Sequence, residues 1–342
     1  MQKNRDTVVD VIRGVAMLLV VLGHTMSGTV SQYSDGLLFQ VIWTLQMPLF
    51  IIISGYVTRY SRPITDGHSL WKFIKKRSLA YMLPWFVWTI LVRGLIFGQT
   101  GFLNIKRLLW HMDSGYWFLV TIWTISMIYG VSDLISNKWF KKEWSNVFSH
   151  LAMCGVGMVG LAIIGYFAGM SFFAIKLTLY YLPIYLLGYL YGKIQAWLMA
   201  KKNAQTIVNC IVVVSLGLWL ATISRFDFYA GGDGALMVAG RFFASILGCI
   251  SVIGLISNIC DGRGKSLGWT GFHSLEIYLT HYLYLRLVPA LGMPVLSSME
   301  GMLSLVLNFA LTVLLTVITI KLVQGNKVMN YLLYAKQEQK HS

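Results

Sequence analysis

The chain has 342 residues, of which 56% are hydrophobic and 12% are charged, and its mean hydropathy is +0.65. A soluble domain carries about 25% charged residues, so this composition disfavours the soluble classes and predicts an all-α, polytopic membrane protein. The net charge of +15 does not indicate nucleic-acid binding, because the cations fall where membrane proteins place them. The four cysteines lack metal-ligand spacing, so we predict packing roles for them, with no disulfide framework and no metal site.

Apolar windows of about 20 residues predict ten membrane-spanning helices. We place these spans roughly at residues 8–26, 37–57, 79–97, 116–135, 149–169, 177–197, 206–224, 238–259, 273–291 and 302–323. No linker or soluble-sized segment separates them. We therefore predict a single transmembrane domain over residues 1–342 without an appended soluble domain, and a first span that is retained rather than cleaved as a signal peptide.

The distribution of Lys and Arg predicts the orientation. With the N-terminus in the cytoplasm, 20 of the 28 cations lie in inside loops, 4 in outside loops and 4 within spans. This asymmetry follows the positive-inside rule, so we expect both termini to be cytoplasmic.

The first span carries three polar side chains, Asp10, Arg13 and His24. Charge in such a run is costly and indicates function. Arg13 and His24 are eleven residues apart, which places them within about 20° on one helix face and roughly 16 Å apart along the axis. Asp10 can pair with Arg13 from one turn away. The alternative is a structural ion pair with an interfacial histidine.

Further candidates occur along the chain. Ser54 and Gly55 end the second span and allow close helix packing or backbone approach to a ligand. Arg59 begins the most basic loop, which either anchors anionic lipid or binds the substrate. Arg77 ends this loop, before the third span.

The outside loop before the fourth span contains His111 and Trp117, which are candidates for the acceptor side, although Trp117 also fits an interfacial aromatic belt. Arg241 lies within an apolar stretch and serves either a substrate or a structural ion pair. Glu276 and His281 share the ninth span but differ by about 140° around a helix, which does not favour a shared ligand or a zinc site.

Five stretches together resemble one known family. They are Arg13 followed by ten residues and then His24, Pro48–Tyr56, Trp117–Leu119, Tyr185–Tyr189 and Ser274–His281, in which Glu276, Tyr278 and His281 fit the family pattern. In this order they are similar to the membrane acyltransferase-3 family, the O-acyltransferases that decorate bacterial surface glycans. The family's paired-arginine segment is matched by Arg77, whereas Ala80 stands at the position of the second arginine.

The resemblance implies an O-acyltransferase of the bacterial cytoplasmic membrane. It would take an acyl group, most simply acetyl, from cytoplasmic acyl-CoA and place it on a sugar hydroxyl of a surface glycan or a lipid-linked precursor. We expect His24 to act as the general base and Arg13, with Asp10, to position the donor or stabilise charge. Ser54 and Gly55 would line the donor cavity. We expect no permanently bound cofactor.

Two other functions remain open from the sequence. Intramembrane Arg and His also mark the substrate path of a transporter of a small anion or saccharide, although no internal repeat is evident. The other is a sensor or assembly scaffold with a degenerate site.

Overall fold

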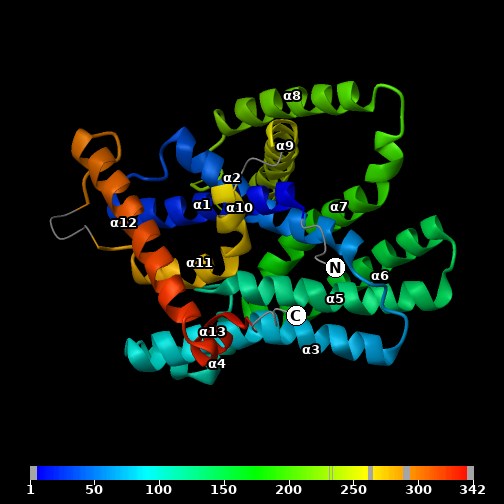
Figure 1. Ribbon diagram of the computed structural model, residues 1–342, viewed down its shortest axis with the longest axis horizontal. Coiled ribbons are helices and arrows are strands. Elements are labelled where there is room, and N and C mark those ends of the chain that lie inside the picture. The colour runs from blue at the N-terminus through cyan, green and yellow to red at the C-terminus, as the bar shows by residue number, and fades with distance from the viewer. Residues whose placement is uncertain (1–5, 231, 233, 261–264, 288–292, 337–342) are drawn as a thin grey trace. The chain divides into compact units, whose positions relative to one another are not determined.

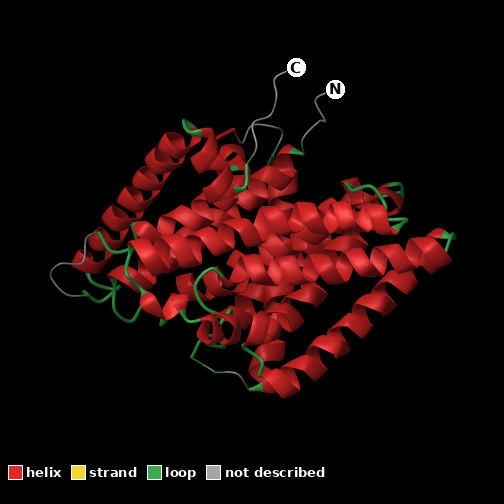
Figure 2. Cartoon of the chain, turned by 90° about the horizontal axis from the view of Figure 1, so that it is seen from below, coloured by secondary structure: helices red, strands yellow, loops and turns green. Residues whose placement is uncertain are grey.

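The computed structural model describes residues 6–230, 232, 234–260, 265–287 and 293–336. These residues fold into helices joined by loops (Figure 2), and the described part of the chain contains no strand beyond one isolated bridge between Ser31 and Val295. The predicted all-helical fold class is confirmed.

The helices group into two compact units. The first unit comprises residues up to Tyr56 together with Leu187–Leu322. Its elements, labelled in Figure 1, are α1 (Thr7–Thr29), α2 (Leu37–Tyr56), the end of α7 (Ile175–Met199), α8 (Ala204–Ile223), α9 (Ala235–Ile259), α10 (Lys265–Phe272), α11 (Ser274–Thr280), a 3-10 turn (His281–Leu283) and α12 (Met299–Gln324).

The second unit comprises Val57–Leu186 and the residues from Val323 onward. Its elements are a 3-10 turn (Val57–Tyr60), α3 (Gly67–Phe86), a π-helical segment (Val87–Ile96), a 3-10 turn (Thr100–Leu103), α4 (Ile105–Trp110), α5 (Trp117–Trp139), α6 (Glu143–Ala168), a 3-10 turn (Phe172–Ala174), the start of α7, and α13 (Lys327–Tyr334). The prediction of one domain over the whole chain stays a prediction.

Nine helical stretches among the described residues are long and apolar enough to cross a membrane. They correspond to nine of the ten predicted spans, which supports the polytopic class. The difference lies at residues 273–291, where we expected one continuous span. The structure has instead the seven-residue helix α11 followed by a short 3-10 turn, and residues 288–292 lie outside the described part.

Burial separates interior helices from peripheral ones. In the first unit, more than half of the most apolar window is buried in α1 and in α2, against 22% in α8. A helix that is apolar all round but buried on one side only presents the rest of its surface to lipid. The polar residues of α1 therefore lie on one of the two most buried helices of the first unit, whereas α8 lies at the edge of that unit.

The start of α1 is fixed by Asp6, whose carboxylate accepts hydrogen bonds from the backbone N–H groups of Val8 and Val9, at 3.1 and 3.3 Å. Further along, the hydroxyls of Thr25 and Thr29 donate to backbone carbonyls one turn earlier, each at 2.7 Å. The hydroxyl protons of these two threonines are thus bonded within the helix itself.

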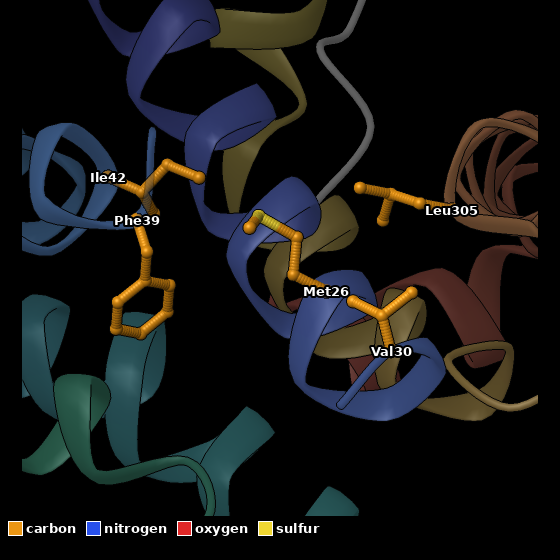
Figure 3. Packing of buried hydrophobic residues seen from close by; sticks show 5 residues of the cluster. All are labelled: Met26, Val30, Phe39, Ile42 and Leu305. Carbon is orange, nitrogen blue, oxygen red and sulfur yellow. The ribbon is translucent and has the colours of Figure 1, made fainter. Parts of the chain in front are cut away.

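The C-terminal end of α1 packs in a cluster that Figure 3 shows. Met26 and Val30 of α1 lie between Phe39 and Ile42 of α2 on one side and Leu305 of α12 on the other. Met26, Val30 and Ile42 are fully buried. This packing fixes the last two turns of α1, and with them the position of His24.

Candidate active site

One continuous helix, α1, carries both Arg13 and His24. Their eleven-residue separation corresponds to roughly 16 Å along the helix axis. Arg13 and His24 are both half-buried, and the side chain of Asp10 is buried. Asp10 and Arg13 each interact with other groups of the protein. The predicted roles of the three residues stay predictions.

The imidazole of His24 meets a tyrosine that the sequence analysis did not select. The hydroxyl of Tyr282 lies 3.0 Å from Nε2 of His24, and the two ring centroids are 4.9 Å apart. Such a bond fixes the orientation of the imidazole and couples its tautomer to the hydroxyl proton. We did not predict Tyr282 because we expected a continuous helix over residues 273–291. Nothing in the spacing along such a helix indicates a contact between Tyr282 and His24.

His281 is the second imidazole of this group. Its ring centroid lies 5.4 Å from that of His24, and the residue is fully buried. Its Nδ1 is 2.8 Å from the carbonyl oxygen of Ile277, which can only accept, so Nδ1 carries the proton. In the neutral ring Nε2 is then an acceptor, and it has no hydrogen-bond partner among the described residues.

The break after Thr280 places these side chains. A broken helix in an apolar interior needs partners for its freed carbonyl groups. The hydroxyl of Thr312 donates to the carbonyl of Tyr284 at 2.9 Å, and the amide of Asn308 donates to that of Leu285 at 2.8 Å. Asn308 also donates to the hydroxyl of Thr29 at 2.6 Å. Two side chains of α12 therefore hold the turn that carries His281 and Tyr282 beside the end of α1.

Glu276 has a partner of its own. Its Oε1 lies 2.8 Å from Nδ1 of His273, and Glu276 is fully buried. Tyr278, from the same helix α11, has its ring centroid 6.2 Å from that of His281. Glu276 thus pairs with the start of its own helix, while His281 contacts His24.

Two glycines let α10 pack closely on α1. A Cβ atom added to Gly271 would overlap the carbonyl oxygen of Asp10, and one added to Gly14 would overlap the carbonyl oxygen of Leu267. Both overlaps are with backbone, so no side-chain rotation relieves them. The close crossing brings the backbone at Asp10 against the helix that leads into His273 and Glu276.

A small cavity of about 30 Å³ lies beside α1 in this unit. Its lining residues are Leu18, Val21, Trp269, Thr270, Ile277, Val313, Thr316 and Val317. Leu18 and Val21 lie between Arg13 and His24 along α1, and Thr270 and Thr316 provide the polar part of the lining. A volume of this size holds about one water molecule.

The other candidates of the first unit lie on α2 and α9. The hydroxyl of Ser54 donates to the carbonyl of Phe50 at 2.7 Å, which is the usual bond of a serine within a helix. Gly55 is buried next to it. The guanidinium of Arg241 lies over the ring of Trp43, at 6.0 Å from its centroid.

The remaining four candidates belong to the second unit. Arg59 is exposed and lies over the ring of Tyr60 at 5.3 Å. Arg77 donates to the hydroxyl of Tyr81 at 3.0 Å. His111 is exposed at the end of α4, and Trp117 stacks on Tyr181 with ring centroids 5.6 Å apart. These positions leave the predicted roles of the four residues untested.

The comparisons with known proteins agree with the resemblance. A family model described as an acyltransferase domain matches residues 6–321. The chain belongs to this acyltransferase family. The match begins at the cap of α1 and includes His24, His281 and Tyr282.

Two curated relatives are both named nodulation protein NolL. The protein from Sinorhizobium fredii is 25% identical over 228 residues, which are 62% of this chain and 57% of the relative. The protein from Mesorhizobium japonicum is 23% identical over 212 residues, which are 57% of this chain and 50% of the relative. The alignments thus cover about half of the length of these relatives. No solved structure matches the chain.

Proposed function

We propose that this protein is a membrane O-acyltransferase. It moves an acyl group, most simply acetyl, from cytoplasmic acyl-CoA to a sugar hydroxyl of a surface glycan or of its lipid-linked precursor, in the cytoplasmic membrane of a bacterium. The observation that carries the proposal is His24, held by Tyr282 beside the buried imidazole of His281, within the part of the chain that matches the acyltransferase family.

The chemistry needs a proton acceptor at the hydroxyl that is acylated. In the proposed reaction the acceptor oxygen attacks the thioester carbonyl, a C–O bond forms, and the hydroxyl proton passes to the imidazole of His24. The C–S bond then breaks, and the departing sulfur takes that proton to leave as the CoA thiol. A neutral imidazole suits this step because it accepts a proton near neutral pH and returns it.

Acyl-CoA needs cationic side chains that bind its phosphates. The reaction also needs a positively charged group near the oxyanion that develops on the thioester carbonyl. Arg13 serves the first role in this proposal. It lies on the same helix as His24, three residues after Asp10, and an axial distance of roughly 16 Å suits the extended pantetheine arm. The substrate-binding roles expected for Arg59 and Arg77 stay predictions.

The decisive experiment uses the purified protein in lipid nanodiscs with labelled acetyl-CoA and a glycan fraction from cells that lack the protein. Wild-type protein should release CoA thiol and move label to the glycan. His24→Ala should lower this rate by about 10² to 10⁴-fold, the usual contribution of a general base. Full transfer by a folded His24→Ala variant would overturn the role of His24, and solute flux that needs no CoA would favour a transporter.

A further inference from the structure

The face of α2 that packs against the last turns of α1 carries two buried polar atoms without a hydrogen-bond partner in the described part of the chain. They are Nε1 of Trp43 and Oε1 of Gln46, and neither has a hydrogen-bond partner among the described residues. An unpaired buried donor or acceptor costs about 1 to 3 kcal/mol, so native proteins keep few of them without a reason. Here a donor and an acceptor occur together, one helical turn apart.

Both atoms lie on the part of α2 that packs against the turns of α1 around His24. Oε1 of Gln46 lies so close to Gly23 that a Cβ atom there would be 3.2 Å from it. Gly23 directly precedes His24 on α1. Trp43 is three residues before Gln46 and packs against the cluster of Met26, Val30 and Ile42. Residues at this spacing lie on the same helix face, with Cβ atoms about 5 to 6 Å apart.

Neighbouring side chains contact the ring of Trp43, so its N–H is the group that we consider for ligand recognition. Phe39 stacks on the indole with ring planes 20° apart, Tyr229 meets it at 89°, and Arg241 lies over it. The indole therefore does not offer an open face for stacking. Its N–H remains a fixed donor, and Arg241 brings further N–H donors to the same side chain.

The loop that supplies Tyr229 is itself well ordered by hydrogen bonds. Gln40 of α2 donates to the carboxylate of Asp227 at 2.8 Å, and the backbone N–H groups of Tyr229 and Ala230 donate to the same oxygen at 2.9 Å each. Partial desolvation raises the pKa of Asp227, but these three bonds outweigh it and lower that pKa below its usual value. The tyrosine is thus held against Trp43 rather than left free in a loose loop.

We propose that Trp43 and Gln46 bind two hydroxyl groups of the acceptor and so present a third to His24. One hydroxyl of the sugar substrate receives a hydrogen bond from the indole N–H of Trp43. Another hydroxyl of the substrate donates a hydrogen bond to the amide oxygen of Gln46. A polyhydroxy compound such as a sugar ring supplies donors and acceptors at adjacent carbons, whereas acyl-CoA is recognised by its phosphates. The inference rests on the proposed function, since it assigns the acceptor half of that site.

The first test compares unpaired groups with paired ones of the same kind. Trp43→Phe and Gln46→Met remove the unpaired atoms. Trp219→Phe and Gln40→Met are the matched controls, because Nε1 of Trp219 donates to Thr44 at 3.1 Å and Gln40 bonds both Asp227 and the N–H of Phe228. We expect the controls to lower the melting temperature more than the two site variants do, because only the controls lose a hydrogen bond within the protein. A loss with Trp43→Phe as large as with Trp219→Phe would overturn the site.

The second test measures transfer from labelled acetyl-CoA to the glycan fraction. Trp43→Phe and Gln46→Met should each raise the KM for the glycan fraction by about 5- to 10-fold, the effect of one lost hydrogen bond of about 1 kcal/mol or slightly more. The KM for acetyl-CoA should not change. An unchanged glycan KM, as expected if the two atoms bind only water, would overturn the inference.

The two proposals fail separately. If wild-type protein transfers no label from acetyl-CoA, the proposed acyltransferase function fails, and the melting comparison still decides whether the two atoms are free for a ligand. If wild-type protein transfers label and the two variants keep its glycan KM, the acyltransferase function stands and the acceptor site fails.

Discussion

The hydroxyl of Tyr282 decides which atoms of His24 are free to react. If the hydroxyl donates to Nε2, Nδ1 of His24 carries the proton, and Nε2 acts as the base once it exchanges this bond for one from the hydroxyl of the substrate. If Nε2 donates instead, Nδ1 is the base. In both arrangements Tyr282 acts through His24, so we assign it as a positioning residue.

Tyr282→Phe should therefore lower kcat by about 5-fold, since a net hydrogen bond contributes roughly 1 kcal/mol, and should leave the KM for acetyl-CoA unchanged. In a His24→Ala background the same substitution should have no further effect, because the residue through which it acts is gone. Initial rates of the four proteins in this cycle test the assignment.

Tyr284→Phe is the matched control for this cycle. Tyr284 lies two residues further on, and its hydroxyl bonds Thr319 at 2.6 Å rather than His24. Its activity should stay close to that of the wild type. A rate loss with Tyr284→Phe equal to that of Tyr282→Phe would show that general loosening of this turn, and not contact with His24, causes the effect.

At the scale of elements, the crossing of α1 and α10 depends on Gly14 and Gly271. Gly271→Ala should destabilise the protein by about 1 to 3 kcal/mol or more, because the new methyl overlaps the rigid carbonyl of Asp10 and forces the two helices apart. Arg13 and His24 move with α1, so we also expect acyl transfer to fall. The melting temperature and the rate of label transfer measure the two effects.

Gly268→Ala provides the control on the same helix. A Cβ atom at Gly268 meets nothing within 4 Å. Alanine is a better helix former than glycine by about 1 kcal/mol, so this variant should keep or raise stability. If both substitutions were equally harmful, the close crossing of α1 and α10 would not be the cause.

The sequence predicted long helices well and the short ones poorly, for a physical reason. A hydropathy window identifies α1 or α12 because some twenty apolar residues are enough to define a span. The segment from Ser274 to Leu287 carries five leucines and an isoleucine among its polar residues, so the same window predicts one more span there. Its interruption depends on Thr312 and Asn308, which bond its carbonyl groups from a helix later in the chain.

The candidate site was partly predictable for the same reason. The spacing of Arg13 and His24 needs only the geometry of one helix, which the sequence supplies. The contact between His24 and Tyr282, and the unpaired atoms of Trp43 and Gln46, depend on how different helices pack, and no local pattern encodes that.

For the whole molecule, the orientation in the membrane is still a prediction, and α8 allows a clean test. Lys202 precedes this 20-residue helix and Arg225 follows it, and both side chains are exposed. The positive-inside rule places Lys202 in the cytoplasm and Arg225 outside. In a background without native cysteines, a membrane-impermeant maleimide added to intact spheroplasts should label Arg225→Cys and spare Lys202→Cys. The reverse pattern would contradict the orientation.

The interrupted segment after Thr280 also bears on how the chain is made. During synthesis residues 281–287 leave the ribosome before α12, so at that moment the carbonyl groups of Tyr284 and Leu285 lack the side chains that will bond them. Hydrocarbon offers no substitute partner. This stretch must wait in a wetter environment, beside the translocon or at the headgroups, until Asn308 and Thr312 arrive. Assembly of the region around His24 is therefore one of the last events in the biogenesis of the protein.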